Sequence, residues 1–263
     1  RGKVTGRAKY AEDFRAEGML FCKLLTSPMP HARVRSIDTT AALALEGVFA
    51  VLTADDIPSA QVPPAPQTPI LTNEPCYVGE PILAVAAVDE TTAQDAIDLI
   101  EIDFEPLPFT VDPLESLYPG GPNARSDGNV AGRFIETQTV KWTARDFAAV
   151  EEGQLPAGEP IVEWAYGDVE AGFEEAAVVV DESFVTAGLS HHCMEPRSCM
   201  AYWENGKCFL HGSSQSQTAM IPGLMRLLGL EQENLVYIAE TCGGGFGSKG
   251  GPYPIMAVPA LLS

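Results

Sequence analysis

The chain has 263 residues, 46% of them hydrophobic, and a formal net charge of −20. A chain of this length and composition is expected to fold as a globular protein of two domains or one large one. The excess of acidic residues disfavours binding to nucleic acid, whose phosphates attract Lys and Arg, and to anionic membrane surfaces. No apolar run is long enough to cross a membrane as a helix.

The six cysteines are scattered, and none has the C-x-x-C spacing of zinc-ribbon or iron–sulfur sites. Isolated cysteines in a chain of this size are typical of buried thiols in a reducing compartment, so we expect a cytoplasmic protein. The chain opens on Arg1, and residues 256–263 have the pattern of a helix that continues past Ser263. We therefore expect a segment of a longer polypeptide.

The first part of the chain is predicted to alternate strands and helices around its own core. Strands are expected at 19–25, 48–52, 81–88 and 100–104, and helices at 39–45 and 91–99. The run 81–88 is almost wholly apolar, as in a buried strand, whereas 100–104 alternates acidic and apolar residues. Asp38 or Thr39 is expected to cap the first helix, and Thr91 or Thr92 the second. The proline-rich stretch 58–75 is expected to be a loop.

A Pro-Gly-Gly-Pro turn at 119–122 indicates a linker before the second half of the chain. After the linker we expect a helix that begins near Asp168 and ends at about residue 177, and then a strand at 178–185. Strands at 199–203 and 207–211 are predicted to form a hairpin, because Asn205-Gly206 is a preferred tight-turn pair. The remaining expected elements are a helix at 217–228 interrupted near Pro222, a strand at 235–239 and a helix at 253–262.

The most informative stretch is 241–251, in which six of eleven residues are glycine. An apolar strand leads into it and a helix is expected after it. A strand, a glycine loop and a helix start can bring bare backbone N–H groups against an anion, because glycine permits positive φ angles and close approach. The pattern predicts a cradle for a phosphate-bearing cofactor.

This loop has three other interpretations. Gly245, Gly247 and Gly250 match the dinucleotide-binding spacing G-x-G-x-x-G, but Pro252 stands where the phosphate-binding helix should begin. A Walker loop is disfavoured because Lys249 is followed by glycine and not by Ser or Thr. The glycines can also serve only a tight turn under a buried sheet.

Two other stretches are rich in polar side chains. The run 213–218 has six consecutive hydroxyl or amide side chains at a strand-to-helix junction, where they can line a polar ligand or cap the helix. The stretch 191–197 contains two adjacent histidines, but successive side chains of a strand point to opposite faces and do not converge on one metal. We expect Glu195 to make a buried structural contact with Arg197 or with a histidine. A serine-hydrolase motif G-x-S-x-G is absent from the sequence.

Short motifs also recur in order along the chain. They are VTGRAKY at 4–10, SP at 27–28, HAR at 31–33, VLT at 51–53, DDIP at 55–58, VGEP at 78–81, EPLP at 105–108, GDVE at 167–170, MEP at 194–196 and CGGGFGSK at 242–249. Their order and spacing resemble the molybdenum hydroxylases, the xanthine dehydrogenase and aldehyde oxidase family. The resemblance is to the N-terminal portion of the molybdopterin-binding large subunit.

The resemblance implies an α+β fold in three parts. An α/β hammerhead domain is expected at 1–113, a linker at 114–166, and the first part of a molybdopterin-binding domain at 167–263. It implies molybdenum held by molybdopterin, as a cytosine dinucleotide, with no direct ligation by protein side chains. Iron–sulfur clusters and FAD are expected on partner subunits or domains, in a hetero-oligomer.

The resemblance also assigns site residues. Gln215 matches the family glutamine that hydrogen-bonds an oxygen ligand of molybdenum. Gly244, Gly245, Phe246 and Gly247 match the loop whose backbone amides approach the metal's oxo ligand and the pterin. The family's general-base glutamate lies much closer to the C-terminus of the large subunit and has no counterpart in this chain.

The activity implied is hydroxylation of an aldehyde or N-heterocycle with water-derived oxygen, with the electrons passed to iron–sulfur clusters. This chain alone is expected to be inactive. Gly250 stands where some purine oxidisers of the family carry a substrate-binding glutamate, so a purine held in that way is not expected. The alternatives are a non-catalytic assembly module of such a complex and a dinucleotide-binding domain that uses the glycine-rich loop.

Overall fold

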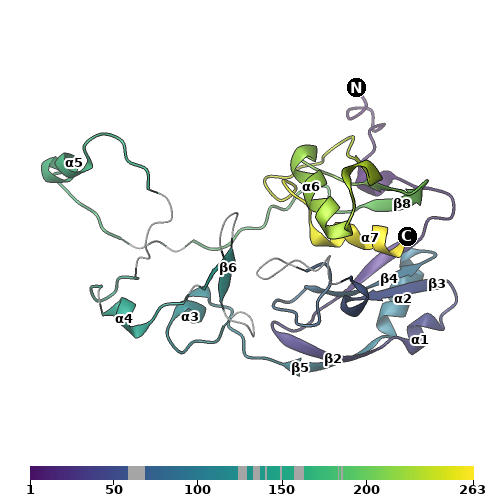
Figure 1. Ribbon diagram of the computed structural model, residues 1–263, viewed down its shortest axis with the longest axis horizontal. Helices are drawn as coiled ribbons and strands as arrows, with labels where there is room; N and C mark the ends of the chain where they lie inside the picture. Colours follow the sequence, from purple (N-terminus) through teal and green to yellow (C-terminus); the bar gives the residue numbers. More distant parts are fainter. Residues whose placement is uncertain are drawn as a thin grey trace.

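Two three-stranded sheets, each with helices beside it, form the body of the protein, and a long arm extends from that body (Figure 1). The computed structural model describes residues 1–58, 69–123, 129–132, 137–139, 141–148, 150–156, 163–182, 184 and 186–263. Among these residues, no helix combines the length and the apolar character needed to cross a membrane.

The first sheet belongs to the N-terminal unit and has the strand order β1-β4-β3. The unit consists of η1 (Ala11–Asp13), β1 (Phe21–Thr26), β2 (Ala32–Asp38), α1 (Thr40–Leu43), β3 (Val48–Thr53), η2 (Ala54–Asp56), β4 (Pro81–Ala87), α2 (Glu90–Asp98) and β5 (Glu101–Pro106). The central strand β4 pairs antiparallel with both neighbours and is buried from its second residue to its last, as its apolar sequence predicts.

Strand β2 was not predicted, because charged residues interrupt its apolar pattern. It pairs antiparallel with β5 in a separate two-stranded ribbon. Arg33 and Arg35 bind the Glu105 carboxylate of β5 at 3.5 and 3.2 Å, so cross-strand ion pairs accompany the ladder on an exposed face. The predicted capping of α2 by a threonine is wrong: Asp89 is the N-cap, and its side chain accepts from Thr92 N.

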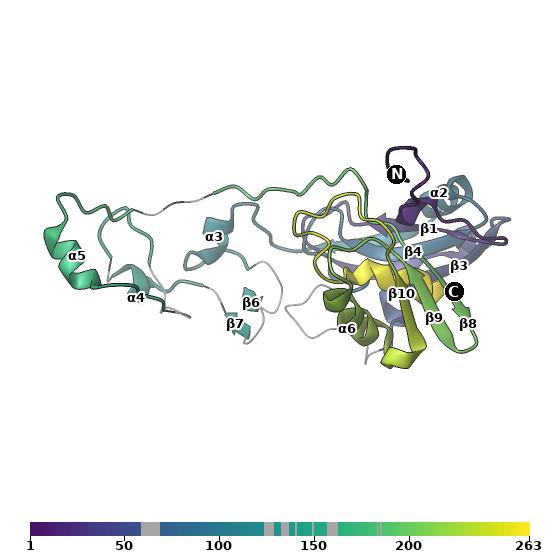
Figure 2. The ribbon, with the colours of Figure 1, turned by 90° about the horizontal axis from the view of Figure 1, so that it is seen from above.

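The arm carries the short elements α3 (Pro113–Leu117), β6 (Val130–Gly132), β7 (Thr137–Thr139), α4 (Ala144–Phe147) and α5 (Val169–Glu175). It extends away from the body in both Figure 1 and Figure 2. Helix α5 begins after Asp168 as predicted, since the Asp168 side chain accepts from Ala171 N at 3.0 Å. The strand predicted at 178–185 does not form in its described residues, where Val178 and Val180 are 77% and 72% exposed. These residues pair with no described strand, and a lone strand has no ladder to stabilise it.

The second sheet has the order β10-β9-β8 and belongs to the C-terminal unit. Its elements are β8 (Met200–Glu204), β9 (Lys207–His211), α6 (Gln217–Leu228), η4 (Gln232–Asn234), β10 (Leu235–Ile238), η5 (Pro254–Ala257) and α7 (Val258–Leu262). Strand β9 is antiparallel to β8 and parallel to β10. Asn205 and Gly206 have φ angles of 51° and 75°, which confirms the predicted tight turn.

Two predicted features of the C-terminal helices are wrong. Helix α6 runs through Pro222 without interruption, since proline removes a single backbone hydrogen bond and the buried face formed by Met220, Leu224 and Leu228 holds the helix in place. The single helix predicted at 253–262 is divided into the 3₁₀ turn η5 and the short α7.

One hydrophobic core joins the two units. Its buried members from the N-terminal unit are Leu52, Ile57, Ile70, Leu71 and Ala84, and those from the C-terminal unit are Cys208, Leu210, Met220, Leu224, Leu227, Leu228, Leu235, Tyr237, Met256, Ala257, Val258 and Ala260. Helix α7 lies between the two sheets (Figure 1). The neighbours of Ala84 in β4, Leu83 and Val85, face a smaller core with Ala42 and Ala96 of α1 and α2, as side-chain alternation requires.

Candidate functional site

The glycine loop follows β10 and folds back onto the link between β9 and α6. Strands β9 and β10 are parallel, so their carboxyl ends lie at the same edge of the sheet. Gly212–Ser216 leaves one of these ends and the loop leaves the other. The structure thus brings the polar run and the glycine run together at a sheet edge where α/β proteins commonly bind ligands.

The Gln215 side chain is held by the glycine loop. Its Oε1 atom accepts hydrogen bonds from Gly247 N at 3.0 Å and Lys249 N at 3.2 Å. The backbone adds a third bond, from Gln215 N to Lys249 O at 3.0 Å. Because two N–H donors face Oε1, the orientation of the carboxamide is determined, and its NH₂ group remains as a donor on an exposed residue.

Close packing explains the glycine at position 245. A Cβ atom added to Gly245 would lie 2.3 Å from Cδ of Gln215, so any side chain at this position would displace the Gln215 carboxamide. Gly244 and Gly247 have φ angles of 105° and 107°, which favour glycine. Phe246 has a positive φ of 52° and is 74% exposed. An aromatic residue in this backbone region is uncommon, and such strain is found preferentially at ligand sites.

The loop also presents backbone donors. Within the part of the chain that the structure describes, the N–H groups of Gly245 and Phe246 have no hydrogen-bond acceptor. Gly245 packs against the Gln215 carboxamide, whose NH₂ group also has no acceptor among the described residues. Several donors in one place can stabilise an anionic or oxo group.

A buried charge cluster lies against the loop. Lys249 Nζ is 2.8 Å from Glu195 Oε2, and Ser213 Oγ donates to the same carboxylate oxygen at 2.6 Å. Gly243 N donates to Oε2 at 2.6 Å and Ala11 N to Oε1 at 3.3 Å. Burial raises the pKa of the Glu195 carboxyl, but these hydrogen bonds, first the one from Lys249, outweigh it and hold the pKa below its ordinary value.

The expected contact of Glu195 with Arg197 or a histidine is therefore wrong. Arg197 instead donates to Ser248 O, and its guanidinium lies 3.7 Å from the centroid of the Tyr253 ring. Lys249 was not predicted as the partner of Glu195. The two residues are 54 positions apart, so no local pattern links them. One feature of the sequence could have indicated the pair: Lys249 lies inside a glycine run but does not fit a Walker loop, so its charge needs another partner.

The histidines of the 191–197 stretch are exposed. His191 Nε2 would lie 3.3 Å from a Cβ atom added to Gly247, so this histidine borders the loop. Cys193 Sγ is 3.4 Å from Gly245 O and 3.5 Å from Ser248 Oγ. Among the described residues, no group of three or more His, Cys, Asp or Glu side chains has the arrangement of a metal site.

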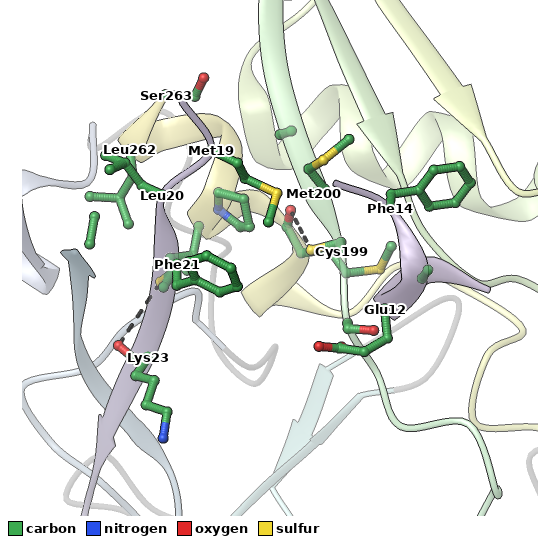
Figure 3. A pocket seen from close by; sticks show the side chains of 18 of the residues that line it. Glu12, Phe14, Met19, Leu20, Phe21, Lys23, Cys199, Met200, Leu262 and Ser263 are labelled. Carbon is green, nitrogen blue, oxygen red and sulfur yellow. Dashed lines mark hydrogen bonds between the residues drawn. The ribbon is translucent and has the colours of Figure 1, made fainter. Parts of the chain in front are cut away.

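A cavity of about 550 Å³ lies elsewhere in the part of the chain that the structure describes. It is between the N-terminal segment 11–24, the start of β8 and helix α7, and Met19, Phe21 and Met200 are among its lining side chains (Figure 3). Neither Gln215 nor Gly243–Gly247 lines it. Burial raises the pKa of Cys199 in its wall to about 12, so this thiol is not a nucleophile at neutral pH.

Comparison with known families identifies the family of the chain. Residues 5–108 match the family described as "Aldehyde oxidase and xanthine dehydrogenase, a/b hammerhead domain". Residues 154–263 match the "Molybdopterin cofactor-binding domain". The chain belongs to the molybdenum hydroxylase family. The α+β fold, with a hammerhead domain before the start of a molybdopterin-binding domain, is thereby confirmed.

Individual molybdenum hydroxylases are similar along nearly the whole chain. The carbon monoxide dehydrogenase large chain of Afipia carboxidovorans is 32% identical over 95% of this chain and 30% of its own length. The nicotine 6-hydroxylase large subunit of Paenarthrobacter nicotinovorans is 30% identical over 99% of this chain and 30% of its own length. The crystal structure of a Cu,Mo-CO dehydrogenase matches with a TM-score of 0.76 and 30% identity over 98% of this chain and 32% of that chain. The chain thus spans about a third of the length of these relatives.

Proposed function

We propose that this chain is the N-terminal portion of the molybdopterin-binding large subunit of an oxidoreductase. The enzyme would hydroxylate an aldehyde or N-heterocycle with oxygen from water and pass the electrons to iron–sulfur clusters. One observation carries the proposal: the glycine loop holds the Gln215 carbonyl oxygen through Gly247 N and Lys249 N, which leaves the NH₂ group of Gln215 as a donor beside free backbone N–H groups of the described loop.

The residues present fit a molybdopterin cofactor. Gly244 and Gly247 adopt positive φ angles, and Gly245 has no Cβ, so the main chain can approach a ligand closely. The Gln215 NH₂ group and the N–H groups of Gly245 and Phe246 would bind its oxygen atoms. When bound, the cofactor supplies the two-electron oxidation of the substrate carbon, while the protein orients and polarises it.

The residues of this chain act by positioning and by electrostatics. Donors fixed before the reaction stabilise negative charge without having to reorganise. The Phe246 ring lies beside Gly244 and is 74% exposed, so it would exclude water from one side of a bound cofactor. A general base is not assigned to any residue of this chain.

The finer features of the assembly are part of the same proposal. We place a hammerhead domain at 1–113, a linker at 114–166 and the cofactor-binding part at 167–263. We propose a cytosine dinucleotide form of molybdopterin, with iron–sulfur clusters and FAD on partner subunits of a hetero-oligomer. The names of the relatives, a large chain and a large subunit, support an assembly of several chains. All six cysteines are free thiols, which suits the cytoplasm.

The test is the molybdenum content of the complex isolated natively from cells, measured by elemental analysis. The proposal predicts stoichiometric molybdenum per chain and release of a pterin nucleotide on denaturation. A folded complex without molybdenum would contradict it. In that case, saturable binding of NAD to the isolated chain would instead support the dinucleotide interpretation of the loop.

A further inference from the structure

A fully hydrogen-bonded pair of opposite charges lies against the glycine loop. The Lys249 and Glu195 side chains are only 2% and 6% exposed, with Nζ and Oε2 2.8 Å apart. Nζ also donates to Glu195 O and to Ser213 Oγ, each at 3.0 Å. All three protons of the ammonium group are therefore used, as a buried lysine requires.

The Glu195 carboxylate joins segments that are far apart in the sequence. Gly243 N donates to it at 2.6 Å, and the Lys249 ammonium donates to it at 2.8 Å. These two residues begin and end the functional part of the loop, so one carboxylate holds both ends. Ala11 N donates to the other oxygen at 3.3 Å, which adds the N-terminal segment to the same anchor.

Lys249 connects this anchor to Gln215. Its backbone N–H donates to Gln215 Oε1, and its backbone carbonyl accepts from Gln215 N. The side chain of Lys249 is therefore fixed by Glu195, while its main chain is bound to both the carboxamide oxygen and the backbone N–H of Gln215. Any displacement of the ammonium would be transmitted to Gln215 through these two bonds.

Stability alone does not account for such a pair. Replacing a buried ion pair by apolar side chains of similar volume is often neutral or stabilising, whereas its geometry is highly directional. We infer that the Glu195–Lys249 pair, with Ser213, positions the glycine loop and the Gln215 carboxamide for the cofactor. This inference rests on the proposed function of the loop.

Hydrogen exchange of the loop amides in the natively isolated complex tests the inference. In Lys249→Met and in Glu195→Gln, exchange of the loop amides that donate hydrogen bonds should be about tenfold faster than in the wild type, equivalent to about 1.4 kcal/mol. These amides are those of Gly243, Gly247, Ser248 and Lys249. The control is Val85→Ala, which removes buried volume in the smaller core and has no atom in the charge cluster. Its loop amides should exchange at the wild-type rate although its melting temperature falls.

A milder variant, Ser213→Ala, tests the inference even if the charge variants do not fold. Ser213→Ala keeps both charges and removes one hydroxyl group, so it should accelerate loop exchange in the same direction by a smaller factor. Wild-type exchange rates at these four hydrogen-bonded amides, in Ser213→Ala and in every charge variant that folds, would overturn the inference. Exchange needs no bound cofactor, so this result can be told apart from a complex without molybdenum, which contradicts the proposed function instead.

A spectroscopic measurement separates positioning from general loss of stability. In the molybdenum-loaded complex, Lys249→Met should change the electron paramagnetic resonance signal of the metal at equal molybdenum content. Val85→Ala should retain the wild-type signal. An unchanged signal in Lys249→Met, together with unchanged exchange, would show that the pair has no influence on the loop.

Discussion

The two ends of the Gln215 carboxamide have different surroundings. Its oxygen is bound by Gly247 N and Lys249 N, whereas its NH₂ group has no acceptor among the described residues and is proposed to bind a ligand. Replacement by glutamate separates these two interactions, because a carboxylate still accepts the two loop N–H bonds but does not donate. Replacement by alanine removes both.

We therefore predict that Gln215→Glu lowers turnover per bound molybdenum by about a hundredfold, the typical effect of removing one donor to a developing oxyanion. The measurement is steady-state turnover of the assembled enzyme with any substrate that the wild type oxidises. Gln217→Ala, an exposed amide at the start of α6, is the matched control and should retain wild-type turnover. Wild-type turnover in Gln215→Glu would show that the NH₂ group is not used.

Glu195 should also make stability depend on pH. Burial raises its pKa, but the hydrogen bonds from Lys249 and the neighbouring donors lower the pKa by more than burial raises it. The folded-state pKa therefore lies below the ordinary value of 4.5. The stabilisation is therefore fully present above about pH 4.5 and is lost as the pH falls through the folded-state pKa. The advantage of the wild type over Glu195→Gln in free energy of unfolding should shrink on acidification. Denaturant titrations of both proteins between about pH 3 and pH 7 measure it, and a difference that stays constant would contradict the assignment.

Among the elements, helix α6 has a glycine whose role depends on a neighbouring loop. A Cβ atom added to Gly223 would lie 2.1 Å from Cγ of Pro252, so the residues after the glycine loop pack directly on the helix backbone. Alanine at an ordinary helix position stabilises by about 1 kcal/mol relative to glycine. At Gly223 the overlap with Pro252 should reverse this sign.

We predict that Gly223→Ala lowers the melting temperature although it raises helix propensity. Gly172→Ala in helix α5 is the matched control, because an added Cβ atom would meet nothing within 4 Å there. That variant should increase the helix content of an isolated α5 peptide, and it should not destabilise the protein. Thermal unfolding followed by circular dichroism compares the two, and equal effects of the two substitutions would contradict the close packing on Pro252.

The elements that the sequence predicted well are those decided by local pattern. The buried strand β4, the Asn205-Gly206 hairpin and the Asp168-capped helix α5 can each be predicted from their own residues alone. Elements that depend on distant partners were predicted poorly. Strand β2 relies on Glu105 across the ribbon, and the run at 178–182 lacks a partner strand among the described residues. At the site, the family motifs pointed to Gln215 and the glycines, but no spacing rule could pair Glu195 with Lys249.

At the scale of the whole molecule, the arm should be the first region that a protease reaches. Trp164 and Tyr166 are 86% and 87% exposed, whereas Tyr237 in the core is 8% exposed. The sequence has no Lys or Arg between Arg145 and Arg197, so trypsin has no site inside this interval. We predict that chymotrypsin cleaves the isolated chain first at Trp164 or Tyr166. Mass spectrometry of early fragments checks this, and initial cleavage within the sheets of the body would contradict it.

The core shared by the two units limits how the chain can be recombined. Ala84 of β4 and Leu210 of β9 belong to one buried cluster, although residues 5–108 and 154–263 match two separate families. A chimaera that takes residues 1–108 from a relative about 30% identical would bring together two core faces that diverged in different lineages. Such mismatched faces leave cavities or overlaps. A chimaera should therefore fold when the core residues of β3 and β4 are replaced together with those of β9, α6 and α7. The part of this protein that can be exchanged between relatives is the whole core, and not one continuous segment of the sequence.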